Sequence, residues 1–128
     1  ARDESVPAQA EAIYEKGLQY LAKSQTSDGC WRDGSGGEPA VVGLCVAAFL
    51  AHGEDPNNGP YAKTIRKGVE FILAQQDSNN GYIGNSMYNH AFATKALALS
   101  KRLATRMRRG AGRSCSACCA LTIRLSIT

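Results

Sequence analysis

The sequence predicts an all-α protein built from stacked helical hairpins, and two observations lead to this fold class. Hydrophobic residues recur at helical spacing in four segments, which are separated by stretches rich in Gly, Asn, Asp and Ser. Part of the first half of the chain also recurs in the second half, 51 residues later. Repeats of this period are typical of stacked helical hairpins. We therefore expect four helices in two hairpins, and no strands.

The first hairpin is expected over residues 7–53. Its first helix covers about residues 7–24, and its hydrophobic stripe consists of Ala10, Ile13, Tyr14, Gly17 and Leu21. Its second helix covers about residues 39–50, and Gly53 is suited to end it because glycine readily adopts the left-handed conformation. This second helix is hydrophobic almost all round, which predicts burial on several sides.

The second hairpin is expected over residues 59–100. Its first helix opens at Pro60, since proline is favoured at the first helical position, and continues to Gln76. Its second helix begins near Asn85 or Ser86, either of which is a good N-cap. We expect the amphipathic first helix of each hairpin on the outside and the more apolar second helix on the inside.

The repeat is clearest in the first helix of each hairpin and in the turn that follows it. Residues 16–21 (Lys-Gly-Leu-Gln-Tyr-Leu) recur as residues 67–72 (Lys-Gly-Val-Glu-Phe-Ile). The turn of the second copy is one residue longer. The matched turn positions are Gln25 and Gln76, Gly29 and Gly81, and Trp31 and Ile83 (or Tyr82 if the register slips). The second copy therefore keeps the glutamine and loses the tryptophan.

The most distinctive motif of the chain links the end of the first helix to the turn. It consists of Lys16, Gly17, Tyr20, Leu21, Gln25, Gly29 and Trp31. We expect the helix to pack through Tyr20 and Leu21, and Trp31 to lie just past the turn. The amide of Gln25 can lie on the indole face or hydrogen-bond a nearby backbone group. Because the motif recurs in degraded form, we interpret it as a structural brace between hairpins.

This motif resembles the QW repeat of squalene and oxidosqualene cyclases, a group that includes prenyltransferase β-subunits and bacterial squalene-cyclase-like proteins. Residues 87–98 are also similar to a stretch of the bacterial members, and the resemblance covers about residues 8–100. It implies an α/α toroid, in which hairpins form two concentric layers around a cavity. Two hairpins cannot close such a ring. We therefore expect a fragment whose partners are the remaining hairpins of the toroid, and a hydrophobic isoprenoid is the ligand class implied.

Residues 101–128 differ in composition from the rest of the chain. They hold seven basic residues and no acidic one, together with Cys115, Cys118 and Cys119, and they show no helical stripe. One interpretation is a disordered basic tail, and a second is an arm that binds nucleic acid. A third is a frameshift just after the codon of Ser100, since restoring one G there turns Lys-Arg into the Glu-Ala expected from the resemblance. Composition favours the frameshift, and we do not favour nucleic acid as a partner.

The sequence offers little catalytic chemistry. The Asp-x-Asp-Asp acid of squalene-hopene cyclases is absent, and the adjacent acids at 3–4 and 54–55 are expected to be solvated. No spacing of Cys45, His52 and His90 supports a zinc site. The glycine-rich residues 34–37 lack the Lys-Ser or Lys-Thr of a phosphate-binding loop. We predict no catalytic residue, no metal and no cofactor.

One polar and aromatic cluster remains as a candidate. Tyr88, Asn89 and His90 stand at the start of the fourth helix, which the toroid resemblance would place at the mouth of the cavity. The alternative, which we favour, is a capping or packing role at the helix N-terminus.

The predicted function is that of a non-catalytic structural or binding segment of a squalene-cyclase-like repeat protein. The alternatives are a segment of a triterpene cyclase whose acid motif lies outside this chain, and a basic-tailed nucleic-acid binder. No segment approaches the roughly 20 hydrophobic residues of a membrane span. No signal peptide is visible in the sequence, and the compartment stays open.

Overall fold

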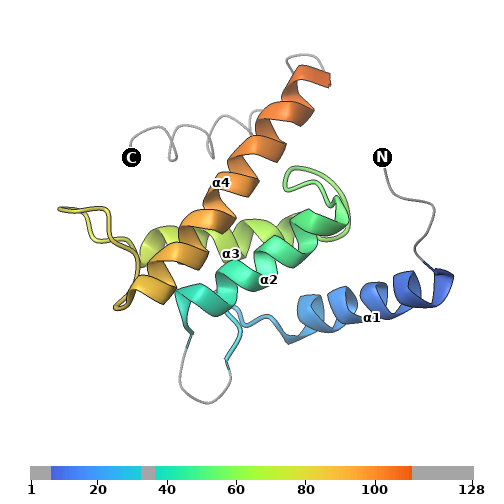
Figure 1. The fold of residues 1–128 in the computed structure, drawn as a ribbon, viewed down its shortest axis with the longest axis horizontal. Helices are drawn as coiled ribbons and strands as arrows, with labels where there is room; N and C mark the ends of the chain where they lie inside the picture. Colours follow the sequence, from blue (N-terminus) through green and yellow to red (C-terminus); the bar gives the residue numbers. More distant parts are fainter. Residues whose placement is uncertain (1–6, 33–36, 111–128) are drawn as a thin grey trace.

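The chain folds into four helices with no strand in the residues that the computed structural model describes, 7–32 and 37–110, with side chains described as far as Thr105. The helices are α1 (Ala8–Ser24), α2 (Pro39–His52), α3 (Ala62–Ala74) and α4 (Met87–Gly110) (Figure 1). The only extended pairings in this part of the chain are two isolated bridges, Arg32 with Gly37 and Gln76 with Ile83. The predicted all-α class is confirmed. The adjacent acids at 3–4, most of the glycine-rich loop and the three cysteines after residue 110 lie outside the described residues.

The helix boundaries agree with their predicted signals except at the start of α3. Gly53 follows α2 with a φ of 97°, and its N–H caps the carbonyl groups of the last turn, as expected for a glycine after a helix. Ser86 caps α4, because its Oγ accepts the N–H of Asn89 at 3.2 Å. The prediction that Pro60 opens α3 is wrong: Pro60 lies in a turn, and the helix begins two residues later, after Tyr61.

Helix α4 continues ten residues beyond Ser100, to Gly110. The second hairpin, expected over residues 59–100, therefore extends further than predicted. Ser100 and Ala104 are buried on the same face of the helix, and Lys, Arg, Leu, Ala and Met, which make up most of this stretch, all favour helix. The change in composition after Ser100 thus does not interrupt the helix.

The core lies where α2 packs along both α3 and α4. Its most deeply buried large side chains come from α2 and α3, and include Val42, Val46, Phe49, Ile65 and Ile72. Helices α2 and α4 approach closely, since a Cβ added to Gly43 would lie 2.7 Å from the carbonyl oxygen of Phe92. The predicted burial of α2 on several sides is confirmed, although Leu44 remains 43 % exposed.

Helix α1 projects away from the other three helices and contacts α2 sparsely (Figure 1). Leu18 is its only fully buried residue. The predicted hydrophobic stripe is largely open to solvent, because Ile13 is 72 % exposed and Tyr14 is 40 % exposed. The prediction that α1 packs through Tyr20 is wrong, since that side chain is 71 % exposed, whereas Leu21 does pack against the core.

Among the described residues, no helix combines the length and hydrophobicity that crossing a bilayer requires.

Candidate functional site

The side-chain amide of Gln25 joins the first hairpin to the second. Its Nε2 donates hydrogen bonds to the carbonyl oxygens of Gly29, at 3.1 Å, and of Thr64, at 2.9 Å. The first bond closes the turn that follows α1, and the second reaches α3. Of the two roles predicted for this amide, the structure therefore has the backbone hydrogen bond. One side chain holds a turn of the first hairpin against a helix of the second.

Gly29 lets the turn approach α3 closely. It has a φ of 90°, in the left-handed region that favours glycine. A Cβ at this position would collide with the backbone carbonyl of Lys67. A side chain here would therefore both strain the turn and push α3 away.

Trp31 completes the brace on the other side of the turn. Its indole Nε1 donates to the carbonyl oxygen of Leu21 at 2.8 Å, which ties the end of α1 to the loop. The ring is buried, and it lies 3.7 Å from the position that a Cβ of Gly68 would occupy on α3. The motif thus links α1, the turn and α3, while its Lys16 and Tyr20 are exposed.

The second copy of the motif repeats the local geometry without the tryptophan. Gln76 Nε2 donates to the carbonyl oxygen of Gly81 at 3.3 Å, and Gly81 has a φ of 75°. Ile83 occupies the position of Trp31 and is buried, and its backbone pairs with that of Gln76 in an isolated bridge. The predicted correspondence of the two turns therefore has a structural counterpart in a glutamine that closes the loop.

The cluster at the start of α4 has its polar atoms engaged within the chain. Asn89 is buried; its Oδ1 accepts the N–H of Ala40 at 3.0 Å, and its Nδ2 donates to Glu38 at 2.8 Å and to Asn85 at 2.9 Å. Asn89 thereby joins the N-terminal ends of α2 and α4. This geometry is that of a capping and packing residue.

The two neighbours of Asn89 differ from it in exposure. His90 Nδ1 accepts the N–H of Ile83 at 3.2 Å, and its ring stacks on Tyr82 at 4.7 Å. Tyr88 is 60 % exposed and packs edge-on against Phe92. Of the three candidate residues, only Tyr88 presents most of its side chain to solvent.

A second polar cluster, which the sequence did not reveal, holds α1 to the end of α2. The ring of His52 lies between two carboxylates, with Nδ1 3.0 Å from Glu54 Oε1 and Nε2 3.0 Å from Glu11 Oε1. Tyr14 stacks on the ring at 5.2 Å and donates its hydroxyl to the carbonyl oxygen of Ala48. Hydrogen bonds to Glu54 and then to Glu11 raise the pKa of His52 above its ordinary value.

A hydrogen bond between Tyr61 and Glu15 extends this contact. The Tyr61 hydroxyl donates to Glu15 Oε1 at 2.8 Å, and burial together with that carboxylate raises the pKa of Tyr61 to about 12. The phenol is therefore a permanent donor at neutral pH. Glu11 and His52 are 41 residues apart, so no local pattern links them. The only sequence signal for the cluster was that Glu11 and Glu15 lie in the first half of α1.

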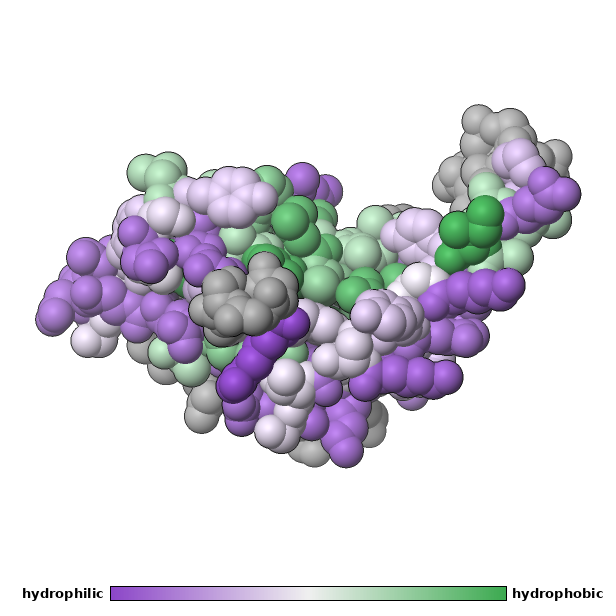
Figure 2. Space-filling view, turned by 90° about the horizontal axis from the view of Figure 1, so that it is seen from below, coloured by the Kyte–Doolittle hydropathy of each residue, from purple (hydrophilic) through white to green (hydrophobic). Residues whose placement is uncertain are grey.

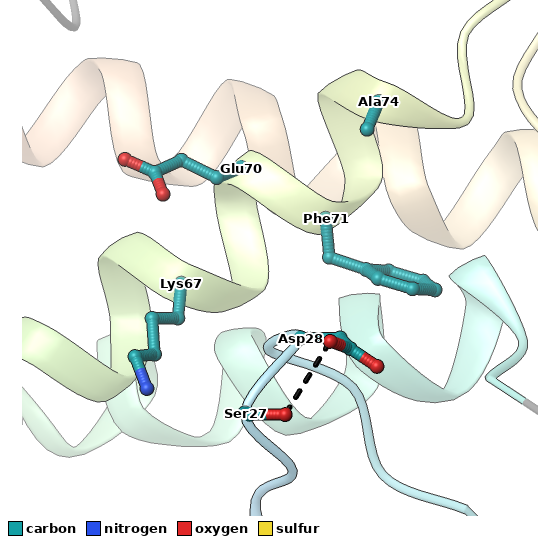
Figure 3. Close-up of a pocket in the computed structure, with 6 residues that line it drawn as sticks. All are labelled: Ser27, Asp28, Lys67, Glu70, Phe71 and Ala74. Atoms are coloured by element: carbon teal, nitrogen blue, oxygen red, sulfur yellow. Dashed lines mark hydrogen bonds between the residues drawn. The ribbon is translucent and has the colours of Figure 1, made fainter.

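A shallow depression lies between the turn after α1 and one side of α3. It is lined by Ser27, Asp28, Lys67, Glu70, Phe71 and Ala74 (Figure 3). The ammonium group of Lys67 and the carboxylate of Glu70 point in different directions, and the one hydrogen bond drawn joins the neighbours Ser27 and Asp28. Its polar groups do not converge on a common point, as those of a ligand site do.

The described cysteines are free thiols without the geometry of a metal site. Cys30 is buried and its Sγ lies 3.1 Å from Thr26 Oγ1. Burial raises the pKa of the Cys45 thiol to about 11, so the thiol is protonated at neutral pH and is a poor nucleophile. No group of three or more His, Cys, Asp or Glu side chains in the described part of the chain is arranged to hold a metal ion.

Comparison with known proteins leaves the family open. No protein-family model matches the chain, and no solved structure matches it significantly.

Proposed function

We propose that this chain is a non-catalytic, structural segment of a squalene-cyclase-like repeat protein, in which its two hairpins form part of an α/α toroid. The observation that carries the proposal is the double hydrogen bond of Gln25, with Trp31 on the other side of the same turn. Gln25 Nε2 and Trp31 Nε1, which the motif contributes to this turn, bind carbonyl groups of α3 and α1 and so hold both helices to the turn. A motif employed in this way supports a role in stacking hairpins.

The polar clusters favour a structural role over a catalytic one. Asn89 and the ring of His52 are engaged with neighbouring groups of the chain. General acid catalysis needs a group within hydrogen-bonding reach of a substrate, and these groups are directed at other parts of the protein. If the complete toroid binds a ligand, the apolar character of α2, the second helix of the first hairpin, suits a hydrophobic isoprenoid.

Sequencing of the complete open reading frame tests the proposal. We expect further copies of Gln-x-x-x-Gly-x-Trp at a spacing of about 50 residues, which is the period of stacked hairpins in this chain. Flanking coding sequence without such copies would contradict it. An Asp-x-Asp-Asp motif in an adjoining hairpin, together with cyclisation of squalene by the complete protein, would instead establish the cyclase alternative.

A further inference from the structure

The first helices of the two hairpins, α1 and α3, differ in how the same face is covered. Tyr14 and Gly17 of α1 correspond to Ile65 and Gly68 of α3, 51 residues later. Ile65 and Gly68 are buried, whereas Gly17 is exposed and Tyr14 is 40 % exposed. The residue types are those of a packed face in both helices, but only in α3 is the glycine of this face covered by another helix.

In α3 the covering helix is α2, and it comes unusually close. A Cβ added to Gly68 would lie 2.7 Å from Val46 Cγ2 and 3.5 Å from Val42 Cγ1. A side chain at this position would therefore force Val46 or the two helices to shift. At Gly17 a Cβ would have no atom within 4 Å, although glycine inside a helix is unfavourable compared with alanine. Gly17 therefore destabilises α1 relative to alanine, and no helix packed against it compensates for this loss.

The exposed face of α1 continues onto α2. Tyr14 bonds the carbonyl of Ala48, and Leu44, one turn earlier on α2, is 43 % exposed. Ile13 and Gly17 are exposed on the same side of α1, and we call the surface that these residues share between the two helices the α1–α2 groove. Figure 2 shows hydrophobic residues along a hollow between the main body and the projecting arm of the molecule.

We propose that the α1–α2 groove docks the second helix of another hairpin of the same repeat type, with small and β-branched residues at the positions of Val42 and Val46. This inference rests on the proposed function and names the surface and the partner through which the segment stacks. The α2–α3 contact is its template, because the two contacts would use equivalent positions on the outer helix. The docked helix would contact Gly17 as α2 contacts Gly68.

A second copy of this chain fits the groove less well. The helix it could offer is α4, which corresponds to α2 in the repeat. Ala93, the counterpart of Val42, is already fully buried within the chain. The exposed residues of α4 include Lys95 and Lys101, whose charges would lose their hydration in a hydrophobic groove. A separate hairpin with an α2-like helix avoids both difficulties.

The experiment extends the chain by one hairpin and asks whether Gly17 becomes packed. A duplicate of residues 7–57 replaces residues 1–6 and keeps the 51-residue period. We expect the extended chain to unfold at a higher temperature than the original. Gly17→Ala should raise the unfolding midpoint of the original chain by about 4 °C, because alanine favours helix and meets no neighbour. In the extended chain the same substitution should lower the midpoint.

Gly68→Ala is the matched control and should lower the midpoint in both chains. A Gly17→Ala substitution that raises the midpoint equally in both, or an extended chain less stable than the original, would overturn the inference. Dimerisation of the original chain in sedimentation that Gly17→Ala weakens would overturn it too, in favour of a second copy. If Gly17→Ala raises the midpoint of the extended chain as well, while the gene holds further copies of Gln-x-x-x-Gly-x-Trp, then the docking inference is wrong and the proposed function still stands.

Discussion

The position of His52 between two carboxylates predicts that α1 is held most firmly at low pH. Both ring nitrogens lie 3.0 Å from a carboxylate oxygen. A neutral imidazole carries one N–H, so it can donate to only one of Glu11 and Glu54, whereas the imidazolium donates to both. Raising the pH therefore turns one of the two contacts from a charge-assisted hydrogen bond into a contact between a lone pair and a carboxylate.

The size of the effect follows from how exposed the two partners are. The Glu54 side chain is 19 % exposed, and we assign its bond about 1 kcal/mol, somewhat less than a fully buried hydrogen bond to a charged group contributes, because solvent screens the pair in part. The Glu11 side chain is 50 % exposed, so solvent screening limits its contribution to about 0.5 kcal/mol. Replacing His52 with Gln should therefore lower the free energy of unfolding by about 1.5 kcal/mol at low pH.

The sign of the pH dependence follows from the raised pKa. A histidine whose pKa is higher in the folded state stabilises that state fully below its unfolded pKa of about 6.5. The stabilisation is lost as the pH rises through the folded pKa. The assay is urea unfolding of the wild type and of His52→Gln at about pH 5.5 and about pH 9. At each pH, the difference in the free energy of unfolding between the two proteins removes the contribution of other titrating groups. A difference that stays constant or grows with pH would refute the two-carboxylate contact.

Three further predictions concern the brace and the thiol. Gln25→Ala should cost about 2 kcal/mol because it leaves two carbonyls without their donor, whereas Gln76→Ala, with one such bond in the structure, should cost about 1 kcal/mol; equal costs in urea unfolding would contradict the inter-hairpin bond. Trp31→Phe should cost about 2 kcal/mol, from the lost bond to Leu21 and the smaller ring, and a neutral result in the same assay would show that the indole is not a brace. Cys45 should react with iodoacetamide at pH 8 roughly 100-fold more slowly than a free cysteine, since its pKa is about 11; peptide mapping by mass spectrometry measures this, and a rate equal to that of a free thiol would contradict its burial.

Local signals predicted the helices well, because each depends on neighbouring residues. Ser86 and Gly53 mark helix ends through their own hydrogen bonds and backbone conformation. Burial on α1 could not be predicted in the same way. A hydrophobic stripe shows that a helix is suited to packing, but Ile13 and Tyr20 are exposed because no helix of the described chain lies over them. The hydrophobic pattern of a helix indicates that one of its faces is suited to packing, but the neighbouring helices decide whether that face is buried.

The candidate site shows the same division between local and distant contacts. The bond from Gln25 to Gly29 spans four residues and could be expected from the motif, whereas the bond to Thr64 spans 39 residues. The link between His52 and Glu11 spans 41 residues and involves residue types that are common on solvated surfaces. Contacts of this kind depend on the register between helices, which a single sequence leaves open.

The brace formed by Gln25 and Trp31 explains why α1 and α3 are held by different kinds of contact. Gln25 and Trp31 belong to the first hairpin but position α3, the first helix of the second hairpin. Helix α3 is thus fixed by the turn and the second helix of the hairpin before it. Helix α1 has no such hairpin in the described chain, and besides the burial of Leu18 it is held to α2 by the polar contacts of His52 and Tyr14. Covering the α1–α2 groove should therefore make the His52 contact less important, so His52→Gln should destabilise the chain extended by one hairpin less than it destabilises the original. An equal loss in both would mean that the polar contact and the docked helix stabilise α1 independently.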